Sequence, residues 1–195
     1  MPDPLDLRRR DAQVPPPDQD YDAVTLAALQ ARAGDPDAAA AFVRACQGDV
    51  WRLCAHLGSR RDADDLTQET FARAFGSLHR FAGRSAGRTW LLSIARRVCA
   101  DAIRTRRPST PVAELEPPGR GADPADTVSL RLLLDGIDPL FREAFVLTQL
   151  VGLSYAEAAE VISCPVGTIR SRVARARDAL VAGLEVGGRT ARGTG

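Results

Sequence analysis

The residues with the clearest chemical potential lie in segment 153–177, LSYAEAAEVISCPVGTIRSRVARAR. Apolar residues recur at helical spacing along a short first helix, and Ser-Cys-Pro at 163–165 interrupts them. Proline is accepted at the start of the following helix, because the N–H group that it lacks has no helical partner there. This second helix places Ile169 and Val173 on an apolar stripe and arginines on its other sides. The pattern predicts a helix-turn-helix whose second helix enters the major groove of DNA.

The predicted DNA contacts of this helix follow from the side chains that it exposes. Small and hydroxyl residues at its start allow a close approach to the bases, Arg175 is placed to reach base edges, and flanking arginines meet phosphates. An arginine-rich helix is also often an ordinary solvated face. The preceding short helix, the tight turn and the small residues favour DNA binding. The predicted contact residues are Gly167, Thr168, Arg170, Ser171, Arg172, Arg175 and Arg177.

A second chemically distinct surface is expected on the helix 62–78, DADDLTQETFARAFGSL. Its apolar residues, among them Leu66, share one broad side, whereas Asp62, Asp65 and Glu69 lie together on the opposite side. Such a face could dock a partner. On spacing alone, ordinary solvation is the simpler interpretation, since a helix dipole favours acidic residues in the first turn.

The helix 88–107, RTWLLSIARRVCADAIRTRR, presents a basic face. Arg96, Arg97 and Arg104 lie on this face with Thr89 and Ser93, and Trp90 lies at its margin. Basic side chains beside an aromatic ring suit single-stranded DNA, because arginines follow the phosphates and the ring stacks on unpaired bases. A core tryptophan next to a solvated basic face explains the same pattern, so this helix alone does not decide between the two.

The charge distribution is local rather than global. The 195 residues carry a formal net charge of only +1, yet segment 84–107 holds seven arginines against Asp101 alone, and the N-terminal part is acidic. The chain contains no lysine, so every basic residue other than histidine offers the planar guanidinium fork that suits guanine or phosphate.

The cysteines and the hydropathy pattern restrict the cellular context. Cys46, Cys54, Cys99 and Cys164 form no C-x-x-C pair and have no histidine at zinc-finger spacing, so we expect buried, reduced thiols and no metal or other cofactor. We find no signal-peptide pattern and no apolar run of membrane-spanning length. We therefore expect a cytoplasmic protein without direct membrane insertion.

The predicted fold class is all-α, with two small helical domains joined by a flexible linker. Helices are expected at 24–32, 37–57 (capped by Asp37), 62–78, 88–107, 128–136, 139–151, 155–162 and 166–184. Proline and glycine make 108–127 the linker between a first domain at 23–107 and a second at 128–184. The acidic extension 1–22 and the tail 185–195 are expected to be disordered.

Taken together, these motifs resemble the bacterial sigma-70 family, specifically its extracytoplasmic-function (ECF) group. Asp65, Leu66, Gln68 and Phe71 match the D-L-x-Q-x-x-F pattern of that family's region 2.2. Segment 88–107 is similar to regions 2.3 and 2.4, and the helix-turn-helix is similar to region 4. The resemblance covers about residues 23–182, with both blocks in the family's order.

The resemblance implies a sigma factor, which binds core RNA polymerase and directs promoter-specific initiation without catalytic chemistry of its own. Polymerase contacts would lie on the clamp helices of the largest subunit and on the flap of the second-largest subunit, and an anti-sigma factor is a further implied partner. The helix-turn-helix would read the −35 element, and a base of the non-template strand would sit near loop 83–87. The residues implied for clamp binding are Asp62, Asp65, Leu66, Gln68 and Glu69. Those implied for −10 recognition and melting are Arg84, Arg88, Trp90, Ser93, Arg96, Arg97 and Arg104.

Two other functions deserve comparison. A stand-alone helix-turn-helix repressor or activator usually dimerises on half-sites, but the chain shows no clear dimerisation helix. A DNA-processing enzyme would need carboxylates from separate elements to share a metal, whereas Asp62, Asp64 and Asp65 cluster on one helix. The combination of two motif blocks favours the sigma factor.

Overall fold

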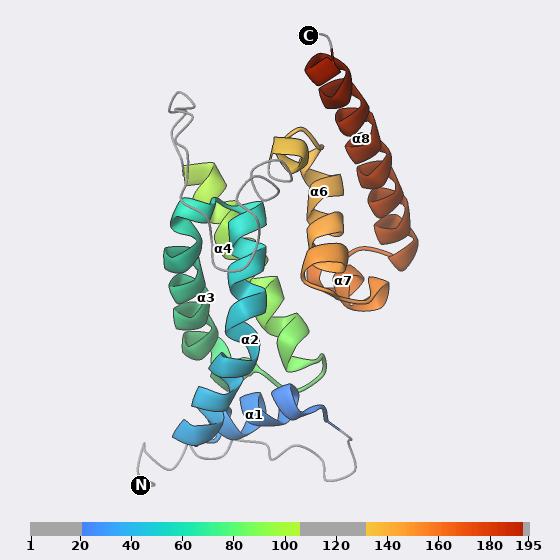
Figure 1. Ribbon diagram of the computed structural model, residues 1–195. Helices are drawn as coiled ribbons and strands as arrows, with labels where there is room; N and C mark the ends of the chain where they lie inside the picture. Colours follow the sequence, from blue (N-terminus) through green and yellow to red (C-terminus); the bar gives the residue numbers. More distant parts are fainter. Residues whose placement is uncertain (1–20, 106–131, 193–195) are drawn as a thin grey trace, which may run out of the picture.

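The computed structural model describes residues 21–105 and 132–192, and every regular element within them is helical (Figure 1). One group of helices comprises α1 to α4 and a second comprises α6 to α8. The predicted linker 108–127 lies outside the described residues, as do residues 1–20 of the expected acidic extension. The all-α prediction is therefore confirmed for the described part of the chain.

The first two helices begin at aspartate caps. Asp22 caps α1 (Ala23–Arg32), and its carboxylate accepts hydrogen bonds from the N–H groups of Val24 and Thr25. Asp35 caps α2 (Pro36–Leu57) in the same way. The predicted cap, Asp37, is wrong, because proline is accepted at the first helical position and the cap lies two residues earlier, at Asp35. Asp37 instead lies in the first turn, where the helix dipole still favours its charge.

The third and fourth helices complete the first group. A single 3₁₀ turn, η1 (Arg60–Asp62), leads into α3 (Ala63–Ser77), and a second one, η2 (Leu78–Arg80), follows it. A short loop then leads to α4 (Gly87–Thr105). Helices α2, α3 and α4 pack against one another, and α1 packs mainly on α2.

The second group contains the predicted helix-turn-helix. α6 (Pro139–Phe145) continues into the π-helical turn η3 (Val146–Leu150), followed by α7 (Tyr155–Ile162) and α8 (Val166–Arg192). Ser154 and Glu157 form a reciprocal capping box at the start of α7. Ser163 ends that helix in the left-handed conformation with φ of 60°, which makes the sharp turn into α8.

The end of α8 differs from the prediction. A tail was expected from residue 185, but the helix continues to Arg192. The glycines at 187 and 188 weaken a helix by about 1 kcal/mol each relative to alanine, which motivated the expected end. No proline follows to break the hydrogen-bonding pattern, and the helix runs through them.

The two groups share one hydrophobic core. Buried side chains of α1 to α4 form a continuous cluster with those of α6, α7 and α8, and α4 packs directly against α7. Figure 1 shows the groups side by side. Cys46, Cys54 and Cys99 are buried free thiols in this core, as predicted, whereas Cys164 is half-buried. Burial raises the pKa of Cys46 to about 11, which keeps its thiol protonated.

None of the helices in the described ranges is both long and apolar enough to cross a membrane.

Candidate polymerase and nucleic-acid surfaces

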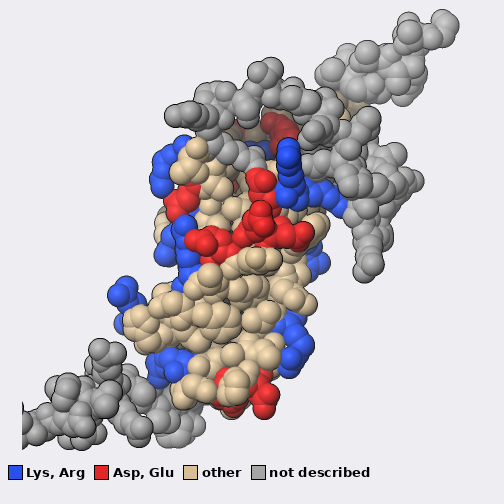
Figure 2. Space-filling view, turned by 90° about the vertical axis from the view of Figure 1, so that its left-hand side faces the viewer, with Lys and Arg blue, Asp and Glu red and all other residues tan. Residues whose placement is uncertain are grey.

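The outer side of α3 carries the predicted acidic face. Asp65, Gln68 and Glu69 are exposed, and Asp62 is half-buried at the start of the helix. Figure 2 looks onto this side of the molecule and shows acidic side chains gathered in a band across it. Leu66 is only 9% exposed and packs in the core, so little of its side chain reaches the surface that Asp65 and Glu69 form. Its role is to anchor the helix that presents its acidic neighbours.

An ion network joins this face to α4. The Arg73 guanidinium donates to Glu69 at 2.7 Å and to Asp101 of α4 at 2.8 Å. Arg73 holds the pKa of Asp101 below its usual value, so the carboxylate remains ionised. Near the start of α3, the Trp51 indole donates to Asp64 at 2.8 Å. These bonds hold α3 against α2 and α4 and fix the orientation of the Asp64 and Glu69 carboxylates.

The predicted −10 arginines divide into two sets. Arg84, Arg97 and Arg104 are exposed to solvent, and Arg104 also pairs with Asp101 at 2.7 Å. Arg88 and Arg96 instead contact the second helix group. The Arg96 guanidinium donates to both carboxylate oxygens of Glu143 in α6, at 2.6 and 3.3 Å.

Arg88 makes a comparable link between the groups. Its Nε donates to Asp49 of α2 at 2.6 Å, and its Nη2 donates to the carbonyl oxygen of Val151 at 2.7 Å. Arg88 and Arg96 therefore lie on the surface of α4 that the second group covers. Both were predicted to bind DNA, and in this arrangement their guanidinium groups are already engaged.

Trp90 is half-buried beside Phe81, with ring centroids 4.9 Å apart and planes inclined by 37°. The Trp90 ring is one of the partly buried side chains that pack against the core, which agrees with the interpretation of Trp90 as a core residue. The Ser93 hydroxyl donates to the Trp90 carbonyl oxygen at 2.7 Å. This bond back to its own helix leaves the oxygen of Ser93 available as an acceptor.

The recognition helix presents most of its predicted residues to solvent. Gly167, Arg170 and Ser171 are exposed at the start of α8, Thr168 and Arg172 are half-buried, and Ile169 and Val173 are fully buried. The Arg175 guanidinium lies over the Phe141 ring, 5.5 Å from its centroid. Arg177 donates to Gln149 at 3.0 Å. These two contacts orient exposed arginines at the wall of the predicted DNA surface.

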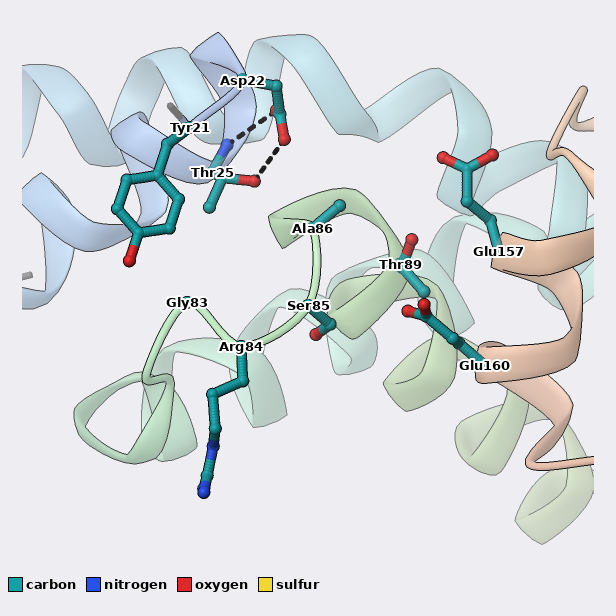
Figure 3. Close-up of a pocket in the computed structure, with 10 residues that line it drawn as sticks. All are labelled: Tyr21, Asp22, Thr25, Gly83, Arg84, Ser85, Ala86, Thr89, Glu157 and Glu160. Carbon is teal, nitrogen blue, oxygen red and sulfur yellow. Dashed lines mark hydrogen bonds between the residues drawn. The ribbon is translucent and has the colours of Figure 1, made fainter. Parts of the chain in front are cut away.

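A cavity of about 300 Å³ lies where the two helix groups meet (Figure 3). Tyr21, Asp22 and Thr25 line it from the start of α1, and residues 83–86 and Thr89 line it from the loop and α4. Glu157 and Glu160 of α7 close the other side, as Figure 3 shows. Arg84 is the predicted DNA-binding residue among those that line it.

Sequence reasoning missed Glu143 and most of the residues that line this cavity. Glu143 lies on the helix before the helix-turn-helix, and no motif marks an acidic residue there as the partner of an arginine 47 positions earlier. Tyr21 and Asp22 are the last two residues of the extension that was expected to be disordered, and Thr25 lies in the first turn of α1. The signal available for Asp22 was an N-cap pattern, which identifies the start of a helix and not a cavity wall.

Comparison with known proteins decides the family. The family model "Sigma-70 region 2" matches residues 42–108, and "Sigma-70, region 4" matches residues 127–180. The ECF RNA polymerase sigma factor SigC of Mycobacterium tuberculosis is 50% identical over 173 residues, which cover 85% of this chain and 94% of that protein. This chain belongs to the ECF group of the sigma-70 family.

Other sigma factors extend the comparison. The ECF RNA polymerase sigma factor SigW of Bacillus subtilis is 30% identical over 174 residues, covering 77% of this chain and 91% of SigW. The structure of CnrH in complex with the cytosolic domain of CnrY matches with a TM-score of 0.70 and 30% identity, over 85% of this sigma factor and 99% of CnrH. The sigma factor RpoE in complex with the anti-sigma factor NepR, from Bartonella quintana, matches with a TM-score of 0.65 and 27% identity, over 74% and 94% of the chains.

Proposed function

We propose that this sigma factor binds core RNA polymerase through the acidic face of α3, reads the −35 element with α8 and engages the −10 element with α4 and the preceding loop. Family membership supplies the overall activity, which is promoter-specific initiation of transcription. The observation that carries the residue assignment is the register of α3. This register buries Leu66 and exposes Asp65, Gln68 and Glu69 on one side.

Complementary charge supports docking of this face on the polymerase clamp. Asp65, Gln68 and Glu69 carry acidic and hydrogen-bonding groups at the surface, and the pair of Glu69 with Arg73 limits the motion of one of them. Exposed charge of this kind mainly sets the orientation and the rate of association. The second helix group would contact the flap of the second-largest subunit.

The DNA-binding assignments follow the exposed basic groups. Arg170, Ser171 and Arg175 would meet the upstream element in its major groove, with Gly167 allowing a close approach because nothing lies within 4 Å of its missing Cβ. Arg84, Arg97 and Arg104 would contact the non-template strand of the downstream element. Arg88 and Arg96 would join them once their contacts with the second helix group open.

We expect the chain to work in the cytoplasm and without catalytic chemistry, since polymerase supplies the active site. An anti-sigma factor is a further expected partner, and both solved relatives described above were determined in complexes, CnrH with the cytosolic domain of CnrY and RpoE with its anti-sigma factor NepR.

The test of the docking face is a charge reversal. Asp65→Arg should abolish binding to core polymerase, measured by co-elution on size-exclusion chromatography, while the helical circular dichroism signal stays that of the wild type. Asp37→Arg makes the same charge change on the exposed first turn of α2, and it should leave binding intact. Wild-type polymerase binding by Asp65→Arg would refute the assignment of this face.

A further inference from the structure

Trp51 of α2 is an aromatic residue that the hydrophobic core covers only in part. It packs against the core, yet the residue as a whole is half-buried. Its indole N–H donates to the Asp64 carboxylate of α3 at 2.8 Å. This bond joins α2 to α3 and uses the one hydrogen-bonding group that the ring has.

A guanidinium lies over the same ring. The Arg60 guanidinium carbon is 5.8 Å from the centroid of the Trp51 ring, a distance at which the ring quadrupole attracts a cation. Arg60 belongs to η1, the turn directly before α3. The tryptophan cluster, which consists of Trp51, Arg60 and Asp64, therefore draws on three successive elements. Contacts with two of them limit the motion of the ring.

The tryptophan cluster adjoins the proposed docking face of α3. Asp64 and Gln68 lie four residues apart in this helix, and residues at that spacing are neighbours on a helix surface. Asp65 directly follows Asp64, and all three side chains are exposed. A partner that covers Asp65 and Gln68 is therefore in a position to cover the accessible part of Trp51 as well.

The chemistry of the cluster suits a residue that becomes buried in a protein–protein interface. Tryptophan and arginine are enriched among the few residues that carry most of the binding energy of an interface. Because the indole N–H already has its acceptor, a partner that covers the ring leaves no polar group of the ring unpaired. Because the ring is held in place before binding, little side-chain entropy is lost on association. Exposed carboxylates mainly set orientation and rate, so an aromatic ring beside them supplies apolar contact area.

We propose that Trp51 is a further polymerase-binding residue, an aromatic anchor that the clamp covers when the acidic face of α3 docks. The inference rests on the proposed function, since that function supplies the clamp as the partner. Asp64 acts as a positioning residue, because its carboxylate holds the indole ring against α3. If Trp51 only tied α2 to α3, its ring would be equally accessible in the free and the bound chain.

The direct test measures the accessibility of the ring before and after binding. Trp51 and Trp90 are the two tryptophans of the chain, so Trp90→Phe leaves Trp51 as the only one. Hydroxytryptophan incorporated into this full-length variant is excited at wavelengths that the tryptophans of core polymerase do not absorb. Its quenching by acrylamide should fall about threefold or more when core polymerase is added, because residues that dominate an interface are shielded from water. Trp51→Phe, which leaves Trp90 as the reporter, should show no such fall.

The affinity for core polymerase is the second measurement, made by competition with the labelled wild-type chain. Trp51→Ala should weaken binding by about tenfold or more, whereas Trp51→Phe, which keeps an aromatic ring, should weaken it by about threefold or less. Leu26→Ala is the matched control. It truncates another accessible apolar side chain of the first helix group, 43% exposed on α1, and should keep the wild-type affinity.

The two measurements separate the inference from the proposed function. Unchanged quenching of Trp51 in a complex that forms, or wild-type affinity in Trp51→Ala, would overturn the inference and leave the proposed function standing. If Trp51→Ala does not fold, the quenching measurement decides alone. A wild-type chain that does not bind core polymerase would overturn the proposed function and the inference with it.

Discussion

Gly83 is a residue for which two independent constraints require glycine. Its φ is +69°, a left-handed conformation that residues with a Cβ rarely adopt. A Cβ would also lie 3.1 Å from the Tyr21 ring, which is closer than an ordinary contact. Because the loop positions Arg84 and one wall of the cavity, its conformation matters for both.

Gly83→Ala should therefore destabilise the protein by about 1–2 kcal/mol, the usual cost of a left-handed residue with a Cβ. Gly76→Ala should do the opposite. Gly76 lies in α3 with nothing within 4 Å of its missing Cβ, so alanine should stabilise the helix by roughly 0.5–1 kcal/mol. Urea unfolding of both variants measures the two changes. If both substitutions changed the free energy of unfolding in the same direction, this explanation of the loop would be contradicted.

At the residue scale, helical periodicity predicted which face each side chain occupies but not what it contacts. It correctly placed Asp65 and Glu69 on the outside of α3. The motif that includes Leu66 does not distinguish this residue, which packs in the core, from its neighbours that lie on the surface. Arg96 lies on the predicted polar face of α4 and Arg88 lies near the start of the helix, yet their partners come from elements far away in the sequence.

At the element scale, local capping decides where α1 begins. Asp22 accepts hydrogen bonds from the N–H groups of Val24 and Thr25, both at 3.0 Å, and from the Thr25 hydroxyl. These bonds favour the ionised carboxylate and outweigh the effect of burial, so the folded-state pKa lies below the ordinary value. The stabilisation is therefore complete above the unfolded pKa of about 3.9 and is lost as the pH falls through the lower folded value.

Asp22→Ala should cost about 1 kcal/mol at pH 7, the typical value of an N-cap. The difference in stability from the wild type should shrink as the pH falls below about 4, because the wild-type carboxylate then becomes protonated. Chemical denaturation at pH 7 and pH 3 measures the stability difference between the wild type and the variant at each pH. Asp22→Asn caps without titrating, so its advantage over the alanine variant should be the same at both values. A wild-type advantage that does not change with pH would contradict this explanation.

Element boundaries were largely predictable from such signals, and the exceptions have physical reasons. The glycine and proline positions located the ends of α2 and α7 within a residue or two. The shift of the α2 cap to Asp35 and the π-helical turn after α6 depend on a competition between adjacent hydrogen-bonding patterns. The competing hydrogen-bonding patterns differ little in local helix propensity, so the packing of the surrounding helices decides between them.

At the scale of the whole molecule, the main finding is the contact between the two helix groups. Glu143 is 13% exposed and Arg96 is 31% exposed, and their bidentate pair is joined by the bond from Arg88 to the Val151 carbonyl oxygen. The sequence predicted two domains on a tether and did not predict that they pack together. A proline-rich linker places no restriction on how its ends are arranged, and neither contact lies within a motif.

Glu143→Gln should increase the affinity of the free chain for a single-stranded oligonucleotide that carries the −10 element. The substitution weakens the pair and releases Arg96 to bind phosphate, a change of up to about fivefold for roughly 1 kcal/mol of ion-pair energy. Fluorescence anisotropy with a labelled oligonucleotide measures it. Glu69→Gln removes the same charge from the α3 face and controls for net charge. An affinity that rises equally in both variants would show that Arg96 is not held back by this pair.

The central claim is that this chain gives core RNA polymerase its promoter specificity. In vitro transcription with purified core polymerase, the full chain and a library of GC-rich bacterial promoter fragments tests it most directly. We predict defined transcripts that appear only when both proteins are present, with start sites at a fixed distance from shared −35 and −10 elements. No transcripts, together with sequence-specific binding of the chain to duplex DNA without polymerase, would contradict the claim.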